Sequence, residues 1–151
     1  MILVLFGQPH SGKSTIANKL IEDCILEWAV NIDGDKLREL FKNKDFSREG
    51  RMKNLNRASD IAVFLNDMTN DVILSLLYPY QEARDYLNSL TEDVKWVYLT
   101  YDEERGRENF HAKDFEIPTE DSILYLNTST TSLGECINLI EKHVKNAKLS
   151  S

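Results

Sequence analysis

Eight residues near the amino terminus have the types and the spacing of a phosphate-binding loop. Residues 7–14, G-Q-P-H-S-G-K-S, fit the pattern G-x-x-x-x-G-K-[ST] and stand between an apolar run and a helical pattern. In this pattern the backbone N–H groups surround the phosphates of a nucleotide, Lys13 contacts the β- and γ-phosphates of ATP, and the Ser14 hydroxyl ligates Mg²⁺. The alternative is a glycine-rich turn that binds nothing. The predicted ATP-binding residues of this loop are Gly7, Pro9, His10, Ser11, Gly12, Lys13, Ser14 and Thr15.

Two carboxylates follow the second apolar run of the chain, at Asp33 and Asp35. Ligands of an open parallel sheet bind beyond the carboxyl ends of its strands, so these acids are expected to face the phosphate loop. One acid could accept the proton of an acceptor hydroxyl, and one could hold the water shell of Mg²⁺. We predict Lys13, Asp33 and Asp35 as catalytic residues and Ser14 with Asp35 as the metal site, and leave open which acid is the base. The competing interpretation is a solvated Asp-Gly turn that caps the next helix.

The elements that must position these residues alternate between short apolar runs and helical patterns. This alternation predicts an α/β protein with the three-layer P-loop NTPase fold, in which helices cover both faces of a five-stranded parallel sheet. Strands are expected at Ile2–Phe6, Ala29–Ile32, Asp71–Leu77, Val94–Thr100 and Ile123–Asn127. Helices are expected at Lys13–Cys24, Lys36–Lys42, Arg48–Thr69, Tyr80–Leu90 and Leu133–Lys145, the last of them capped by Ser132 with Glu135 in capping-box spacing.

Residues 102–121 show little periodicity and are strongly charged, which is typical of a long surface segment. We call this stretch the lid segment and expect it to cover the site. Its arginines, Arg105 and Arg107, are predicted to bind ATP and to neutralise charge as the phosphate bond breaks.

Length and composition limit what the chain can be. A chain of 151 residues suits one domain, residues 1–151. The net charge of −7 disfavours a nucleic-acid partner, and no apolar run is long enough for a membrane span. The first apolar run lacks a basic flank and stops at Gly7, so it predicts a strand and not a signal peptide, and hence a cytoplasmic protein. Cys24 and Cys136 are expected to be buried helical residues.

Beyond these patterns the chain resembles the adenylylsulfate kinase family over nearly its whole length. The resemblance rests on the phosphate loop, I-D-G-D-x-x-R at 32–38, F-S-R-E-G-R-M-K-N at 46–54, and L-Y-P-Y at 77–80 followed by Arg84. It implies ATP and Mg²⁺ as cofactors, transfer of phosphate to the 3′-hydroxyl of adenylylsulfate, and a homodimer as the assembly seen in many members. The positions that it implies for acceptor binding are Arg38, Phe46, Arg51, Asn54, Tyr78 and Pro79.

Several positions depart from the family pattern on the acceptor side. Tyr78 replaces a serine, Gln81 replaces an arginine, and Gly50 stands where an acid is usual. The lid segment is short and lacks the family phenylalanine that stacks on the acceptor base; Arg105, Arg107, Lys113 and Phe115 are the residues that could substitute. The resemblance implies adenylylsulfate as the small nucleotide-like acceptor. Because the departures lie on the acceptor side, cytidine diphosphoramidate is the alternative. A kinase of polynucleotide 5′-ends and a non-catalytic nucleotide-binding regulator are rival hypotheses.

Overall fold

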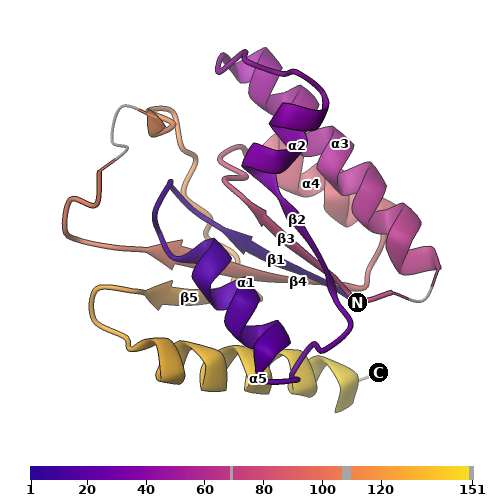
Figure 1. Ribbon diagram of the computed structural model, residues 1–151, viewed down its shortest axis with the longest axis vertical. Coiled ribbons are helices and arrows are strands. Elements are labelled where there is room, and N and C mark those ends of the chain that lie inside the picture. Colours follow the sequence, from indigo (N-terminus) through magenta and orange to yellow (C-terminus); the bar gives the residue numbers. More distant parts are fainter. Residues whose placement is uncertain (69, 107–109, 150–151) are drawn as a thin grey trace.

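The computed structural model describes residues 1–68, 70–106 and 110–149 and contains a five-stranded sheet (Figure 1). The strands are β1 (Ile2–Phe6), β2 (Val30–Asp33), β3 (Val72–Leu76), β4 (Val94–Thr100) and β5 (Leu124–Asn127). Each neighbouring pair is parallel, and the order across the sheet is β2-β3-β1-β4-β5. The predicted fold class is therefore confirmed.

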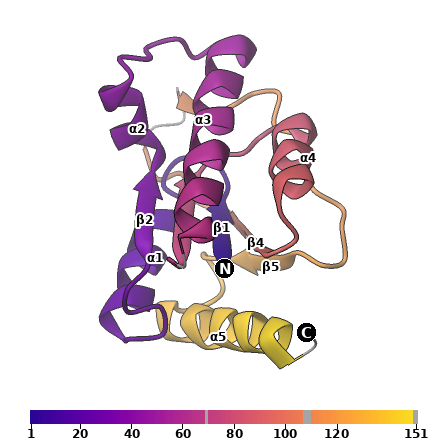
Figure 2. The same ribbon diagram turned by 90° about the vertical axis from the view of Figure 1, so that its right-hand side faces the viewer.

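Helices cover both faces of the sheet and make three layers. One face carries α2 (Gly34–Leu40), α3 (Arg48–Asp67) and α4 (Gln81–Leu90), and the other carries α1 (Lys13–Glu22) and α5 (Leu133–Leu149), as Figures 1 and 2 show. Within the described parts of the chain, no helix combines the length and the apolar character needed to cross a bilayer.

The central strand β1 explains why the chain begins with an uninterrupted apolar run. Ile2, Val4 and Phe6 belong to the core under α3 and α4, whereas Leu3 and Leu5 belong to the core under α1 and α5. All five residues of β1 are completely buried. A parallel strand covered on both faces needs apolar side chains at every position, because neither side meets water.

Some predicted boundaries shift for local reasons. Helix α2 begins at Gly34, two residues before the predicted Lys36, because the Asp33 carboxylate accepts from the backbone N–H groups of Asp35 and Lys36 and caps the helix. Helix α1 ends at Glu22, and Cys24 lies beyond it with φ 60° and an exposed side chain. The prediction of a buried helical Cys24 is wrong, whereas Cys136 is buried.

The other boundaries agree to varying degrees with those predicted. Helix α5 continues to Leu149 instead of ending at Lys145, and its predicted cap is present because the Ser132 hydroxyl accepts from the Glu135 N–H at 3.2 Å. Strand β4 has the predicted bounds. Thr69, the expected last residue of α3, lies outside the described residues.

The lid segment has neither an α-helix nor a strand among its described residues, yet its second half is firmly attached. The backbone N–H of Glu116 donates to the Pro79 carbonyl at 2.7 Å, and the Glu116 carboxylate accepts from the Gln81 N–H and from Arg48. The buried Arg84 donates to the carbonyls of both Tyr78 and Glu116 at 2.7 Å. Arg84 therefore joins the loop after β3 to the lid segment.

Candidate active site

A cavity of about 410 Å³ opens where β1, β2 and β3 end. The order of the strands places β3 between the other two, so the phosphate loop after β1 and the acids after β2 lie on either side of the end of β3. The cavity is lined by these residues proposed from sequence: Pro9, His10, Gly12, Lys13, Ser14, Thr15, Asp33, Asp35, Arg38, Phe46, Arg51, Asn54, Pro79 and Arg105.

The phosphate loop is curled around the Lys13 ammonium group. Its Nζ donates to the carbonyls of Gly7 and Gln8 at 2.9 and 2.8 Å. Gly7 has φ 148°, and a Cβ there would lie 2.3 Å from the Leu99 carbonyl oxygen, so a larger residue would not fit. Of the ATP-binding residues predicted in this loop, Gly7 and Ser11 do not line the cavity, and the Ser11 side chain is completely buried.

Both predicted acids face the phosphate loop. The Ser14 hydroxyl donates to Asp33 Oδ2 at 3.2 Å, while Asp33 Oδ1 accepts from the N–H groups that begin α2. Asp35 is exposed and lines the same cavity. Asp33 thus caps a helix and also contacts the loop serine, so the two interpretations of this motif are compatible.

Two arginines lie beside one phenylalanine ring on the far side of the cavity. The guanidinium carbon of Arg38 is 4.2 Å from the centroid of the Phe46 ring, and that of Arg51 is 5.7 Å from it. Burial, and after it the nearby charge of Arg51, lowers the pKa of Arg38. Like charges held this close favour an anion between them, and guanidinium groups suit phosphate or sulfate oxygens.

Asn54 on α3 has a side-chain oxygen that receives no hydrogen bond from the described part of the chain. The side chain is 5% exposed and lines the cavity, and its Nδ2 approaches the Gly34 carbonyl at 3.5 Å. Within the described part of the chain, Asn54 Oδ1 is buried and has no hydrogen-bond partner. Buried polar atoms are nearly always satisfied, so this oxygen is available to a donor that enters the cavity.

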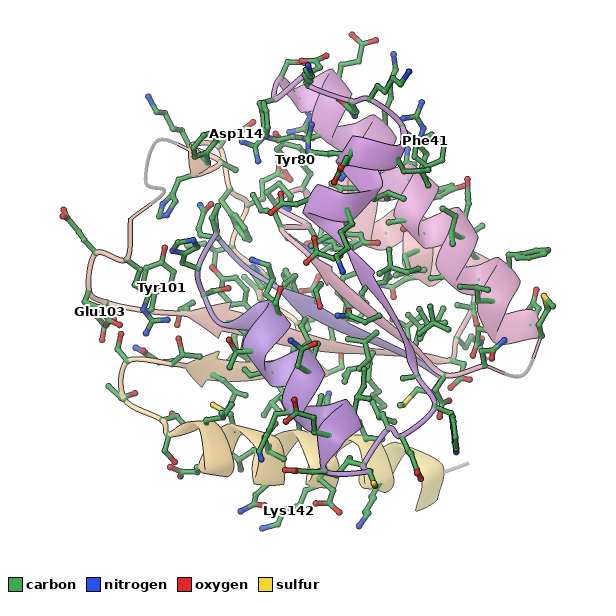
Figure 3. All side chains as sticks on the ribbon, in the orientation of Figure 1. Phe41, Tyr80, Tyr101, Glu103, Asp114 and Lys142 are labelled. Carbon is green, nitrogen blue, oxygen red and sulfur yellow. The ribbon has the colours of Figure 1, made fainter. Side chains whose placement is uncertain are left out.

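The lid segment reaches the cavity at two places. Arg105 donates to the His10 carbonyl at 3.0 Å and to the Thr128 hydroxyl at 2.9 Å, and it pairs with Glu103. Figure 3 labels Glu103 and Tyr101 at this base of the lid segment. A hydrogen bond from Ser129, with further ones from its own backbone and Arg105, lowers the pKa of Glu103 to about 2. Arg107 lies outside the described residues.

The aromatic residue of the lid segment that lines the cavity is Phe110, not the expected Phe115. The centroid of its ring lies 6.0 Å from that of Phe46, and Arg51 Nη2 approaches its carbonyl at 3.4 Å. Phe115 packs instead on Tyr98, with centroids 5.7 Å apart. The sequence could not distinguish the two phenylalanines, because the segment has no periodicity that shows which side chains face inward.

The predicted acceptor contact by the Tyr78 side chain is also wrong. Tyr78 is completely buried and does not line the cavity; its hydroxyl lies 3.0 Å from that of Ser59, and burial raises its pKa. The ring packs edge-on against Trp96. With φ 42° the backbone of Tyr78 turns its side chain into the core, while the adjacent Pro79 faces the cavity.

Sequence reasoning also missed the end of β3. Ser75, Leu76 and Leu77 line the cavity between the phosphate loop and the acids. Nothing in their residue types marks them as ligand contacts. Only the strand order places them there, and an order that inserts β3 between β1 and β2 depends on contacts distant in sequence. The remaining lining residues not predicted from sequence are Gly34, Leu55 and Phe110.

In P-loop kinases, ATP is held by a lysine that lies within a glycine-rich loop. The next residue is a serine, which here is bonded to the acid at the end of β2. This sheet and this loop define the protein as such a kinase. The model of the adenylylsulphate kinase family matches residues 1–109, so the chain belongs to that family and is an ATP-dependent kinase.

Individual relatives agree with this assignment. The adenylyl-sulfate kinase of Bacillus licheniformis is 31% identical over 95% of this chain and 84% of its own length. The cytidine diphosphoramidate kinase of Campylobacter jejuni is 28% identical over 93% of this chain and 94% of its own length. The solved Mycobacterium tuberculosis APS kinase, in complex with AMPPNP and APS, shares the fold with a TM-score of 0.80 and 22% identity, covering 95% of this chain and 96% of that one.

Proposed function

We propose that this kinase transfers the γ-phosphoryl group of MgATP to the 3′-hydroxyl of adenylylsulfate. The proposal rests on one observation: the phosphate loop and the arginine pair line the same cavity. A phosphate donor at one end and an anionic nucleotide at the other would meet across Asp33 and Asp35. The family relationship supports the same reaction.

The residues at the donor end fit Mg²⁺. Ser14 and Asp33 offer hard oxygen ligands that are already hydrogen-bonded to each other. In the part of the chain that the structure describes, no three His, Cys, Asp or Glu side chains form a metal-binding group. Mg²⁺ in kinases is typically bound by one or two protein ligands together with substrate phosphates and water, so Ser14 and one aspartate suffice. When bound, the ion neutralises charge on the phosphates.

The chain's own residues supply positioning and charge. The amides of the phosphate loop and Lys13 hold the β- and γ-phosphates, which requires Lys13 to exchange its bonds to Gly7 and Gln8 for bonds to phosphate oxygens. The sequence predicted Asp35 beside Ser14 at the metal, but because Asp33 is bonded to Ser14 we assign Asp33 to the metal side. Asp35 is left to orient the acceptor hydroxyl and accept its proton. Arg105, beside His10, neutralises charge on the phosphates.

The acceptor end suits a nucleotide that carries a second anionic group. Arg38 and Arg51 bind the phosphosulfate, and Phe46 with Phe110 encloses the base at the mouth of the cavity. Both rings are about half exposed, at 49% and 46%, so they have apolar surface that a base would cover. Asn54 Oδ1 accepts from a ligand N–H or O–H.

Cytidine diphosphoramidate is the second candidate acceptor. This chain spans a larger share of the Campylobacter jejuni kinase, 94%, than of the Bacillus licheniformis enzyme, 84%. Stacking between two phenylalanines tolerates either base, because each base has an aromatic face. The arginine pair also accommodates either tetrahedral anion.

The test is a panel of acceptors incubated with MgATP, with ADP release measured by a coupled assay and the product identified by mass spectrometry. We expect the highest kcat/KM with adenylylsulfate, and Lys13→Ala as the inactive control. Turnover confined to cytidine diphosphoramidate would transfer the assignment to that acceptor, and turnover with 5′-hydroxyl oligonucleotides would show a polynucleotide kinase. Binding of ADP by calorimetry without turnover on any acceptor would indicate a non-catalytic regulator.

A further inference from the structure

One side chain of the phosphate loop does not line the cavity and bonds to the lid segment instead. Gln8 Nε2 donates to the Ala112 carbonyl at 2.9 Å, and Gln8 Oε1 accepts from the Ala112 N–H at 3.0 Å. The amide therefore satisfies both backbone groups of one residue that lies 104 positions away. Two complementary bonds fix the orientation of a backbone as well as its distance, which a single bond would not do.

A second contact beside it strengthens the attachment. The Tyr101 hydroxyl donates to the Pro9 carbonyl at 2.6 Å and lies 2.9 Å from His111 Nε2. The phosphate loop is thus joined to the lid segment twice, directly from Gln8 to Ala112 and through Tyr101 from Pro9 to His111. Ala112 is 4% exposed, so water does not compete easily for its backbone groups. We call the Gln8–Ala112 pair the clasp.

Ala112, the lid residue of the clasp, lies two residues after Phe110, which lines the acceptor end of the cavity. Phe110 is the lid residue that faces Phe46, and its carbonyl lies near the Arg51 guanidinium. The described part of the lid segment has no α-helix or strand, and Phe110 lies only in a short 3₁₀ turn. Contacts outside regular structure, the clasp among them, therefore help to set the direction of Phe110. The Gln8 carbonyl also accepts from Lys13 Nζ at 2.8 Å, so Gln8 contacts the lysine of the donor end and, through Ala112, holds the backbone two residues from Phe110.

We propose that Gln8 is a positioning residue that places Phe110 for acceptor binding, so that part of the phosphate loop serves the acceptor and not the nucleotide. This inference rests on the proposed function, because it assigns the acceptor end to the cavity between Phe46 and Phe110. The two hydrogen bonds to Ala112 need a side chain that both donates and accepts, and the glutamine amide does both.

The test compares Gln8→Leu, which keeps the size and removes both bonds, with Gln8→Glu, which keeps only the acceptor. In Gln8→Leu we expect KM for adenylylsulfate to rise about tenfold and KM for ATP to stay within about twofold, since one to two net hydrogen bonds are lost on the acceptor side. In Gln8→Glu the defect should shrink as the pH falls toward the ordinary glutamate pKa of about 4.3, because a protonated carboxyl restores the donor. A merely structural defect would not recover with acid.

A readout without acceptor separates this inference from the proposed function. Hydrogen exchange at the Ala112 amide should be at least about tenfold faster in Gln8→Leu than in the unmodified protein, whatever the acceptor is. Tyr125→Phe, which removes a lid hydrogen bond to the Glu120 carbonyl far from the cavity, is the matched control and should leave Ala112 exchange unchanged. If adenylylsulfate is not turned over, the acceptor assignment fails while exchange still decides the clasp. Unchanged exchange in Gln8→Leu, or equal rises in both KM values, would overturn the inference.

Discussion

Two guanidinium groups beside one phenylalanine ring dominate the acceptor half of the cavity. Arg38 donates to the Asp45 carbonyl at 3.0 Å, and Arg51 Nε donates to the Phe46 carbonyl at 3.0 Å. Each side chain is thus held in place by backbone oxygens that do not neutralise it. Two oriented positive charges in a confined space bind a divalent or tetrahedral anion more strongly than flexible surface lysines would.

Arg51→Lys tests whether the planar guanidinium matters or only its charge. We expect kcat/KM for the acceptor to fall about tenfold or more, because lysine cannot make paired bonds to one anion, while KM for ATP changes little. Steady-state kinetics with each substrate varied in turn would measure this. Arg57→Lys is the control, because Arg57 lies on the same helix but stacks on Phe41 outside the cavity. Equal losses in both variants would argue against a specific clamp.

The buried hydroxyl pair of Ser59 and Tyr78 anchors the loop that carries Pro79. Tyr78→Phe would leave the Ser59 hydroxyl without its partner in the core and should lower the free energy of unfolding by about 1–2 kcal/mol. Adding Ser59→Ala should recover part of this loss, since no polar group then remains unsatisfied. Urea denaturation of the two single variants and the double variant gives the coupling. Strictly additive losses would show that the hydroxyls do not interact.

At the level of elements, the start of α3 is built around the absence of a side chain at Gly50. A Cβ at this position would lie 2.2 Å from the Asp45 carbonyl oxygen and 2.4 Å from its carboxyl carbon. Asp45 in turn accepts from the Ser47 N–H, and Ser47 caps α3 by accepting from the Gly50 N–H. The glycine that departs from the family pattern is therefore required by this turn, which carries Phe46 and precedes Arg51.

Gly50→Ala should consequently destabilise the protein by about 2 kcal/mol or more, because backbone and side chain of Asp45 must both move. It should also weaken acceptor binding, since Phe46 lies within the displaced turn. Gly134→Ala provides the contrast: its Cβ would meet nothing within 4 Å near the start of α5. Alanine there is expected to be neutral or stabilising by up to about 1 kcal/mol. Thermal denaturation of both variants would reveal whether the clash is real.

At the scale of the whole molecule, the carboxylates of Glu116 and Glu103 bond the lid segment to the rest of the protein, and these bonds should weaken in acid. The N–H of Gln81, and after it Arg48, lowers the pKa of Glu116, and a hydrogen bond from Ser129 does most to lower that of Glu103. A carboxyl whose pKa is lower in the folded state stabilises that state above its unfolded pKa. This stabilisation is lost as the pH falls through the folded pKa.

Glu116→Gln should therefore lower the denaturation midpoint at pH 7, and the difference from the unmodified protein should shrink as the pH falls below the ordinary glutamate pKa of 4.5. Protonation then removes from the unmodified protein the charge that the variant already lacks. Thermal denaturation at several pH values measures the gap. A gap that stays constant into acid would mean that the Glu116 charge does not stabilise the lid attachment.

Local chemistry is what could be predicted well from the sequence. The phosphate loop is recognisable from its fixed motif, and the apolar run of β1 and the acids that follow the second run are recognisable from their place in or next to a regular strand. In such pieces the direction of each side chain follows from its place in the chain. The three-layer fold followed from the same alternation of elements, and the observed sheet confirms it.

Tertiary structure alone decided which irregular residues face the cavity. The insertion of β3 between β1 and β2 brings Ser75 to Leu77 into the site, φ 42° turns Tyr78 into the core, and the path of the lid segment brings Phe110 and not Phe115 to the cavity. These outcomes depend on contacts between residues far apart in the chain. The sequence by itself determined the phosphate-loop motif after β1, whereas long-range packing determined which residues line the rest of the cavity, because irregular backbone has no period from which side-chain directions follow.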